Sequence, residues 1–276
     1  MFPYMIQGNN IVVVIGTQPH TINKTHVAYE KVKEAIRTGN WDTVKKIIDP
    51  EKVVLDYGNG RIAVQGEKLF WDGHEMHNAL SRRMIQMLQE DFPIEPLAKF
   101  MENLQENPSF RAVNELYGFL ENNSLPITPD GHFLAYKKVR DDFMDVHSGT
   151  VANKPAYALT DEEKAAMPVT SGKKKEVTVA VENGVTVVSM PRNMVNDDKN
   201  QTCSEGLHFC SKEYLNHFGG DRIVILKINP RDVVSIPTDY NNSKGRAARY
   251  EITGELGVDP EVAFTASVQS EANVGA

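Results

Sequence analysis

The sequence has few cysteines and no long apolar run. Its two cysteines, Cys203 and Cys210, lie close together in 276 residues, which indicates a reducing compartment rather than a disulfide framework. The longest apolar run near the N-terminus, residues 11–15, has the length of a strand and precedes Gly16, so we interpret it as neither a membrane span nor a signal peptide. The net charge of −7 argues against a dedicated nucleic-acid binder, which would carry a basic surface.

Common enzyme motifs are also absent. The chain contains no P-loop, GxGxxG, HExxH or GxSxG pattern. Its hydrophobic fraction of 41% and charged fraction of 24% are typical of soluble globular proteins. We therefore expect a cytosolic globular protein that carries no cofactor.

The first third of the chain mixes helix and strand signals. A β-branched run at residues 11–15 is followed by two helical patterns, at 26–37 and 40–48. Short strand patterns then alternate with the turn signals Asn59-Gly60 and Asp72-Gly73. We predict a small α+β unit over residues 1–76.

The remainder divides into a helical and a β-rich part. Residues 77–124 repeat apolar side chains at helical spacing and predict three amphipathic helices packed as core. Residues 125–258 predict a mixed β-sheet with short helices, including an insertion at about 152–188 that ends in a hairpin across Asn183-Gly184. Residues 259–276 are acidic and predict a flexible tail. The fold class that we expect is α+β.

Residues 190–219 concentrate polar side chains. Both cysteines lie here with His208 and His217, but the spacing C-x4-H-x-C-x6-H lacks the close ligand pairs of structural zinc sites. Cys203 also has histidines nearby that could act as bases, yet no nucleophile elbow or helix start is indicated. We predict neither a metal site nor a catalytic residue, and we interpret the segment around His208 as a strand with a half-buried polar side.

Basic residues and histidines gather in the C-terminal half, and guanidinium groups suit phosphate. A pocket of Arg, His and Asn side chains could hold a small anionic or nucleotide-type ligand. The alternative is that Arg192 and Arg231 pair with acidic residues to pin loops, and both interpretations stay open. The residues that we predict to bind a ligand are Lys137, Arg140, His147, Arg192, Asn196, Asp197, His208, His217, Arg231 and Tyr240.

Several of these residues belong to longer motifs. The motifs span residues 102–109, 130–140, 145–148, 190–198, 201–219 and 229–241. Together they resemble the rIIB family of T-even bacteriophages, over roughly residues 50–255. The T-even proteins begin with a helix-turn-helix-like segment that we do not find here, so we do not expect DNA as a partner. They are also shorter around residues 155–183.

The resemblance implies a phage-encoded protein of the infected bacterial cytoplasm, associated peripherally with the inner membrane. It implies protection against prophage-triggered exclusion and early lysis, together with lysis inhibition, and an rIIA-like phage protein as partner. We expect a non-enzymatic homo-oligomer that binds a protein partner or a small anionic ligand. The alternatives are an enzyme acting on a nucleotide or ADP-ribose-type substrate and an oligomeric structural scaffold.

Overall fold

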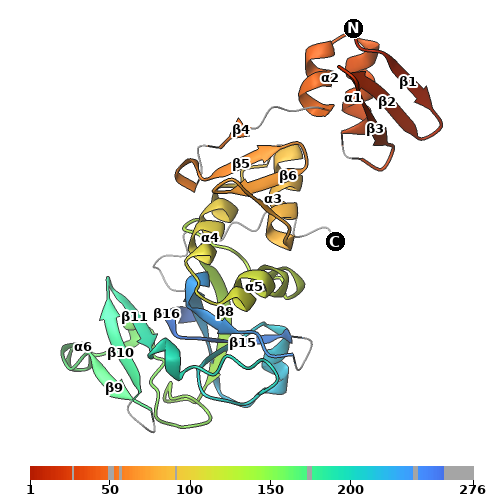
Figure 1. Cartoon of the computed structure of the whole chain (residues 1–276). Helices are drawn as coiled ribbons and strands as arrows, with labels where there is room; N and C mark the ends of the chain where they lie inside the picture. Colours follow the sequence, from red (N-terminus) through yellow and green to blue (C-terminus); the bar gives the residue numbers. More distant parts are fainter. Residues whose placement is uncertain are drawn as a thin grey trace. The chain divides into compact units, whose positions relative to one another are not determined.

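A computed structural model describes residues 1–26, 28–48, 53–55, 58–90, 92–172, 176–238 and 242–257 (Figure 1). Helices and antiparallel sheets both contribute, which confirms the α+β class. The chain divides into two compact units, Met1–Ile94 and Glu95–Ala276. The domain boundaries at residues 76/77 and 124/125 stay predictions. Among the described residues, no helix is both long and apolar enough to span a bilayer.

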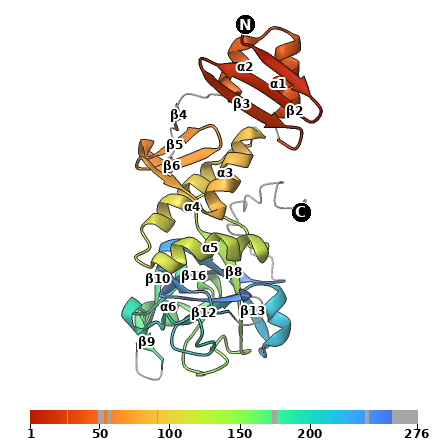
Figure 2. The ribbon, with the colours of Figure 1, turned by 45° about the vertical axis from the view of Figure 1, so that its right-hand side comes forward.

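The first unit begins with a three-stranded antiparallel sheet. Its strands are β1 (Tyr4–Gln7), β2 (Asn10–Ile15) and β3 (Gln18–Asn23), in that order across the sheet. Helices α1 (Tyr29–Arg37) and α2 (Trp41–Ile48) cover one face, as Figure 2 shows. Ile11 and Val13 of β2 are fully buried with Val32 of α1 and Val44 of α2, so alternate residues of β2 supply the core.

The first unit continues with a four-stranded meander. Its strands are β4 (Val53–Val54), β5 (Ile62–Gln65), β6 (Lys68–Trp71) and β7 (His74–Met76), and the short 3-10 helix η1 (Gly58–Gly60) precedes β5. The turn predicted at Asp72-Gly73 is confirmed, because both residues have the positive φ of a tight hairpin (48° and 84°). Helix α3 (Ala79–Gln89) packs against β6, and the Asn78 side chain caps it by accepting from the Ser81 N–H.

A nine-stranded antiparallel sheet forms the second unit. In order across the sheet, its strands are β14 (Val233–Ser235), β15 (Lys244–Ala247), β12 (Leu207–Cys210), β8 (Phe133–Val139), β13 (Arg222–Ile228), β16 (Arg249–Glu255), β11 (Val185–Ser189), β10 (Val177–Glu182) and β9 (Val169–Ser171). Five short helices lie in its connections: η2 (Ala156–Ala158), α6 (Asp161–Ala165), η3 (Arg192–Met194), η4 (Glu213–His217) and η5 (Pro230–Asp232).

Helices α4 (Glu95–Gln105) and α5 (Phe110–Asn122) also belong to this unit, in which α4 packs against η5 and α5 against β14. The Phe209 ring lies edge-on between Phe119 of α5 and Phe133 of β8. It also covers Gly245, where an added Cβ would lie 2.2 Å from the ring, so glycine is required for this contact. With α3, these helices confirm the three predicted amphipathic helices.

The segment at 152–188, predicted as an insertion, contributes strands to the nine-stranded sheet. The hairpin turn at Asn183-Gly184 is confirmed, with φ of 50° and 80°. Strand β11 then pairs with β16 along four residues, so the hairpin extends the main sheet. One of the short helices expected in this part of the chain is the 3-10 helix η4. The lysine run at 173–175 and the predicted tail at 259–276 lie outside the described residues.

Candidate functional site

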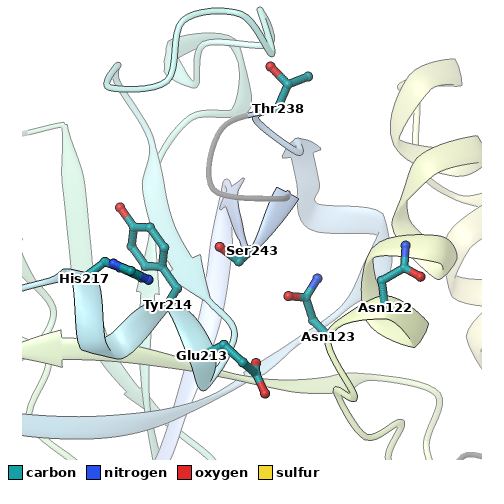
Figure 3. A pocket seen from close by; sticks show the side chains of 7 residues that line it. All are labelled: Asn122, Asn123, Glu213, Tyr214, His217, Thr238 and Ser243. Carbon is teal, nitrogen blue, oxygen red and sulfur yellow. The ribbon is translucent and has the colours of Figure 1, made fainter. Parts of the chain in front are cut away.

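The second unit contains an open cavity of about 720 Å³. Its lining residues are Asn122, Asn123, Glu213, Tyr214, His217, Thr238 and Ser243. Figure 3 shows Tyr214 and His217 on one side, the two asparagines on the other and Ser243 between them. The cavity therefore lies where η4, the end of α5 and the segments flanking β14 and β15 meet.

Backbone and side-chain hydrogen bonds hold these elements in place. The ammonium group of Lys138, on β8, donates to the Phe218 carbonyl at 2.9 Å and fixes the end of η4, while Leu215 is buried beneath it. The Asn123 amide donates to the carbonyls of Phe119 (2.9 Å) and Asn242 (3.2 Å), which joins the end of α5 to the start of β15. The cavity is thus framed by ordered structure on both sides.

The lining is polar but carries little charge. Glu213 supplies a carboxylate, and carboxamides, hydroxyls, a phenol and an imidazole make up the rest of the described lining. The Lys244 ammonium, on a buried residue, lies 5.6 Å from the centroid of the Tyr214 ring. Such a surface can donate to and accept from a peptide backbone or polar side chains, and it offers an aromatic ring for stacking.

Arg192, on η3, forms a clamp between distant segments. Its guanidinium donates to the Arg231 carbonyl at 2.8 Å, the Val233 carbonyl at 2.9 Å and the Asn107 Oδ1 atom at 2.7 Å. Asn107 in turn donates to the carbonyls of Pro230 and Val233, both at 2.8 Å. Burial lowers the pKa of Arg192, and the nearby Asp232 carboxylate opposes this effect. The clamp binds the loop before β14 to the loop before α5.

A second arginine organises the loop between η3 and β12. Arg246 on β15 is fully buried and donates to the carbonyls of Gln201 (2.5 Å) and Asp198 (2.7 Å) and to the Ser235 hydroxyl (3.1 Å). Within the loop, the Asn196 side chain donates to Gln201 and Ser204 and accepts from the Asp198 N–H. The polar motif at residues 196–204 is therefore built around a buried cation.

Lys137, His208 and Cys210 lie where β8 meets β12. Burial, reinforced by the charges of Lys137 and Arg246, lowers the pKa of His208 to about 3, so the ring is neutral at physiological pH. Burial raises the pKa of Cys210 to about 12, and its thiol donates to the Tyr136 carbonyl. Burial also lowers the pKa of Lys137, against the attraction of Asp145. Neither a thiolate nor an effective imidazole base is available here.

Comparisons with known proteins agree with the sequence motifs. The family model described as bacteriophage T4 protein rIIB matches residues 3–161 and 163–263. Protein rIIB of Enterobacteria phage T4 is 35% identical over 247 residues, which cover 89% of this chain and 70% of that protein. The chain belongs to the rIIB family. The match extends well beyond residues 50–255, over which the motifs were recognised. No solved structure matches the chain significantly.

In this rIIB-family chain, the ten predicted ligand-binding residues do not converge on one pocket. Of the nine that the structure describes, His217 lines the cavity of about 720 Å³. Arg231 borders a smaller cavity of about 90 Å³, next to Asp232 and His132. Its guanidinium also approaches Glu106 at 3.3 Å. Tyr240 lies outside the described residues.

The other predicted residues serve local structure. Arg140 pairs with Asp142 on the surface at 2.5 Å, and the Asp197 carbonyl accepts from Arg111 at 3.3 Å. The His147 ring lies edge-on to Phe218 at 5.1 Å between centroids. Like the loop-pinning interpretation, these contacts connect loop segments to one another. The partners of Arg192, however, are carbonyl oxygens rather than acidic side chains. Ligand binding by these residues stays a prediction.

Sequence reasoning missed six lining residues: Asn122, Asn123, Glu213, Tyr214, Thr238 and Ser243. Tyr214 lies inside the rIIB motif at 201–219, which was the available signal for it. The asparagines carried no signal beyond ending a predicted helix. Within the described part of the chain, no group of three or more His, Cys, Asp or Glu residues is arranged to hold a metal ion.

Proposed function

We propose that this rIIB-family protein acts in the phage-infected bacterial cytoplasm as a binding protein that protects the infection from prophage-triggered exclusion and early lysis. The observation that carries the proposal is the cavity of about 720 Å³, framed by η4 and the end of α5 and lined by groups that suit a polypeptide. Its partner is an rIIA-like phage protein, and the complex sits peripherally at the inner membrane.

Binding is favoured over catalysis by how the polar groups of the family motifs are used. The guanidinium groups of Arg192 and Arg246 are directed at backbone carbonyls. His208 is neutral and Cys210 is a thiol at physiological pH, for the reasons given above. A nucleotide-processing reaction would need an available base or nucleophile in the same place.

A polypeptide is favoured over a small anion by the charge of the lining. An anionic ligand would face the Glu213 carboxylate, and the described lining offers it no lysine or arginine. A peptide could donate to Glu213 and the asparagine oxygens and stack on Tyr214. The cavity thus fits a polar or basic segment of a partner protein.

The test is complementation. A phage that lacks its own copy of the gene is plated on a host carrying the excluding prophage, while the host expresses the wild-type chain, Tyr214→Ala or Glu213→Lys. The matched controls are Tyr157→Ala, at a tyrosine that is 49% exposed on η2, and Glu162→Lys on α6. We expect the cavity variants to lower plating at least about tenfold, and the controls to plate like wild type.

Two further measurements separate the alternatives. Co-expression with the rIIA-like protein should give a complex on size exclusion that Glu213→Lys abolishes at unchanged melting temperature. Wild-type plating by both cavity variants would contradict the proposal. Turnover of a nucleotide or ADP-ribose that His208→Ala abolishes would establish the enzymatic alternative instead.

A further inference from the structure

Among the residues that the structure describes, strand β1 is an edge of the three-stranded sheet with no partner on its outer side. It pairs with β2 on one side, and all four of its residues, Tyr4–Gln7, are exposed. Three of them are apolar or aromatic: Tyr4 is 45% exposed, Met5 53% and Ile6 44%. The free side of such a strand presents backbone N–H and C=O groups that a further strand can pair with.

On the helix-covered face of this sheet, apolar side chains are buried on β2 and β3 but exposed on β1. One row of register partners crosses the sheet from Ile22 on β3 through Ile11 on β2 to Ile6 on β1. The first two side chains are 7% and 0% exposed, whereas Ile6 is 44% exposed. Tyr4, opposite the buried Val13, lies 5.8 Å from the Trp41 ring of α2. Tyr4 and Ile6 therefore continue the helix-covered face of the sheet without being covered themselves.

The two edges of the sheet are built differently. Strand β3 contains Pro19, which lacks the N–H needed to extend a ladder. Strand β1 contains neither proline nor charge, and residues 2–23 contain no Asp, Glu, Lys or Arg. Natural proteins normally protect edge strands with such devices. Of the two edges of this three-stranded sheet, only β1 lacks both devices, which points to an edge that is paired in use.

We propose that β1 pairs with β1 of a second copy of this chain, antiparallel and about a two-fold axis, to form a continuous six-stranded sheet. Alternate residues of a strand direct their hydrogen-bonding groups to the same side, so opposite residues in such a pair differ by an even number. With Met5 on the axis, it faces Met5 of the partner subunit, and Tyr4 faces the partner's Ile6. All three exposed apolar residues then find apolar cross-strand neighbours.

A second copy fits this edge for electrostatic reasons. In a two-fold pair, a charge on the axis would face its own copy, and like charges placed opposite each other are destabilising. The neutral β1 meets no such penalty. The same pairing covers Tyr4 and Ile6 beside Trp41, which completes the core on both copies. Because the paired strand is short, we expect an association in the micromolar range, about 8 kcal/mol.

The test places charges on the proposed axis. Met5→Lys sets two ammonium groups opposite each other, about 5 Å apart at the backbone. The matched control is Thr21→Lys, which adds the same charge at an exposed position of β3 on the same face, since both residues are register partners of Val12. Sedimentation of the whole chain should give a dimer for wild type and Thr21→Lys at about 100 µM and a monomer for Met5→Lys.

A charge-complementary mixture sharpens the test. Met5→Glu alone should also be monomeric, whereas an equimolar mixture of Met5→Lys and Met5→Glu should recover the dimer, because opposite charges then face each other on the axis. An unchanged urea unfolding midpoint, measured by circular dichroism at a dilution where wild type is monomeric, would show that each variant is folded. A monomeric wild type at that concentration, a dimeric Met5→Lys, or a mixture that stays monomeric would each overturn the proposal.

Discussion

The β1–β3 sheet and the nine-stranded sheet are stabilised by different kinds of interaction. The β1–β3 sheet encloses an apolar core of Ile11, Val13, Ile22 and the helix residues above them, and no Asp, Glu, Lys or Arg lies between residues 2 and 23. The nine-stranded sheet buries Lys244 and Arg246 beside its apolar core, together with amide and hydroxyl side chains. Hydrophobic burial is non-directional, whereas a buried cation must be met by oriented acceptors.

This difference determines which structural feature each region holds in place. In the first region, apolar burial shapes a small core and leaves β1 free at the edge. In the second, Arg192 binds the carbonyls of Arg231 and Val233 at the start of β14. Arg246 on β15 binds carbonyls of the loop between η3 and β12. The cavity is lined by residues that flank β14 and β15. Directional hydrogen bonds fix irregular loops that apolar packing alone would leave poorly specified. We therefore interpret the rIIB motifs as residues that hold the loops around the cavity in place.

Replacing Arg246 should break the second region most severely. Arg246→Met keeps the apolar stem but removes the charged donor to the carbonyls of Gln201 and Asp198, and the loss of these two hydrogen bonds should lower the free energy of unfolding by roughly 3–5 kcal/mol. The chain provides a convenient probe, because both tryptophans, Trp41 and Trp71, lie in the first unit. Urea unfolding should show an early loss of circular dichroism with an unchanged tryptophan transition.

The matched control is Arg37→Met on α1. Arg37 is an exposed arginine that pairs with Glu34 at 2.6 Å, so its removal should leave the free energy of unfolding almost unchanged. A tryptophan transition that moves together with the circular dichroism in Arg246→Met would show that the two regions unfold as one. An effect as small as that of the control would show that the buried cation is dispensable.

Acidification should weaken the second region through His208. Its pKa in the folded protein, about 3, lies below the ordinary value of 6.5, so the unfolded chain takes up the proton first. The free energy of unfolding therefore falls as the pH drops from about 6.5 toward 3, by roughly 1–2 kcal/mol between pH 7 and 5. Burial also lowers the pKa of His132, which adds a loss of the same sign.

His208→Gln should flatten this dependence, as measured by urea unfolding at pH 7 and 5. The control, His77→Gln, changes a histidine whose side chain is 77% exposed in the first unit and should leave the slope as in wild type. An equal slope in His208→Gln and wild type would assign the acid sensitivity to other groups.

The sequence predicted the parts of the fold that depend on local signals. The turns at Asp72-Gly73 and Asn183-Gly184 follow from residues that tolerate positive φ, and helices α3 and α5 follow from apolar periodicity. Strand β15 was missed, because Lys244–Ala247 carries no strand pattern. It is a strand because β12 and β14 pair with it on both sides.

The cavity was harder to predict because three distant segments build it. His217 was recognised as a polar residue in an rIIB motif, but the approach of α5 to η4 depends on the packing of Phe119 and Leu215. Arg192 was recognised as unusual, yet nothing local indicates that its acceptors are the carbonyls of residues 231 and 233. Backbone acceptors have no residue type and so leave no trace in a sequence.

The smallest effect should come from the apolar region. Ile11→Val removes one methylene from a fully buried site and should lower the free energy of unfolding by roughly 0.5–1.5 kcal/mol, seen in the tryptophan transition and not in that of the second unit. The control is Ile6→Val, which removes the same atoms from the register partner of Ile11 on the exposed edge. In dilute solution it should change stability by less than about 0.5 kcal/mol. At concentrations where β1 pairs with a second copy, the cost of Ile6→Val should rise toward that of Ile11→Val, because the same methylene is then buried.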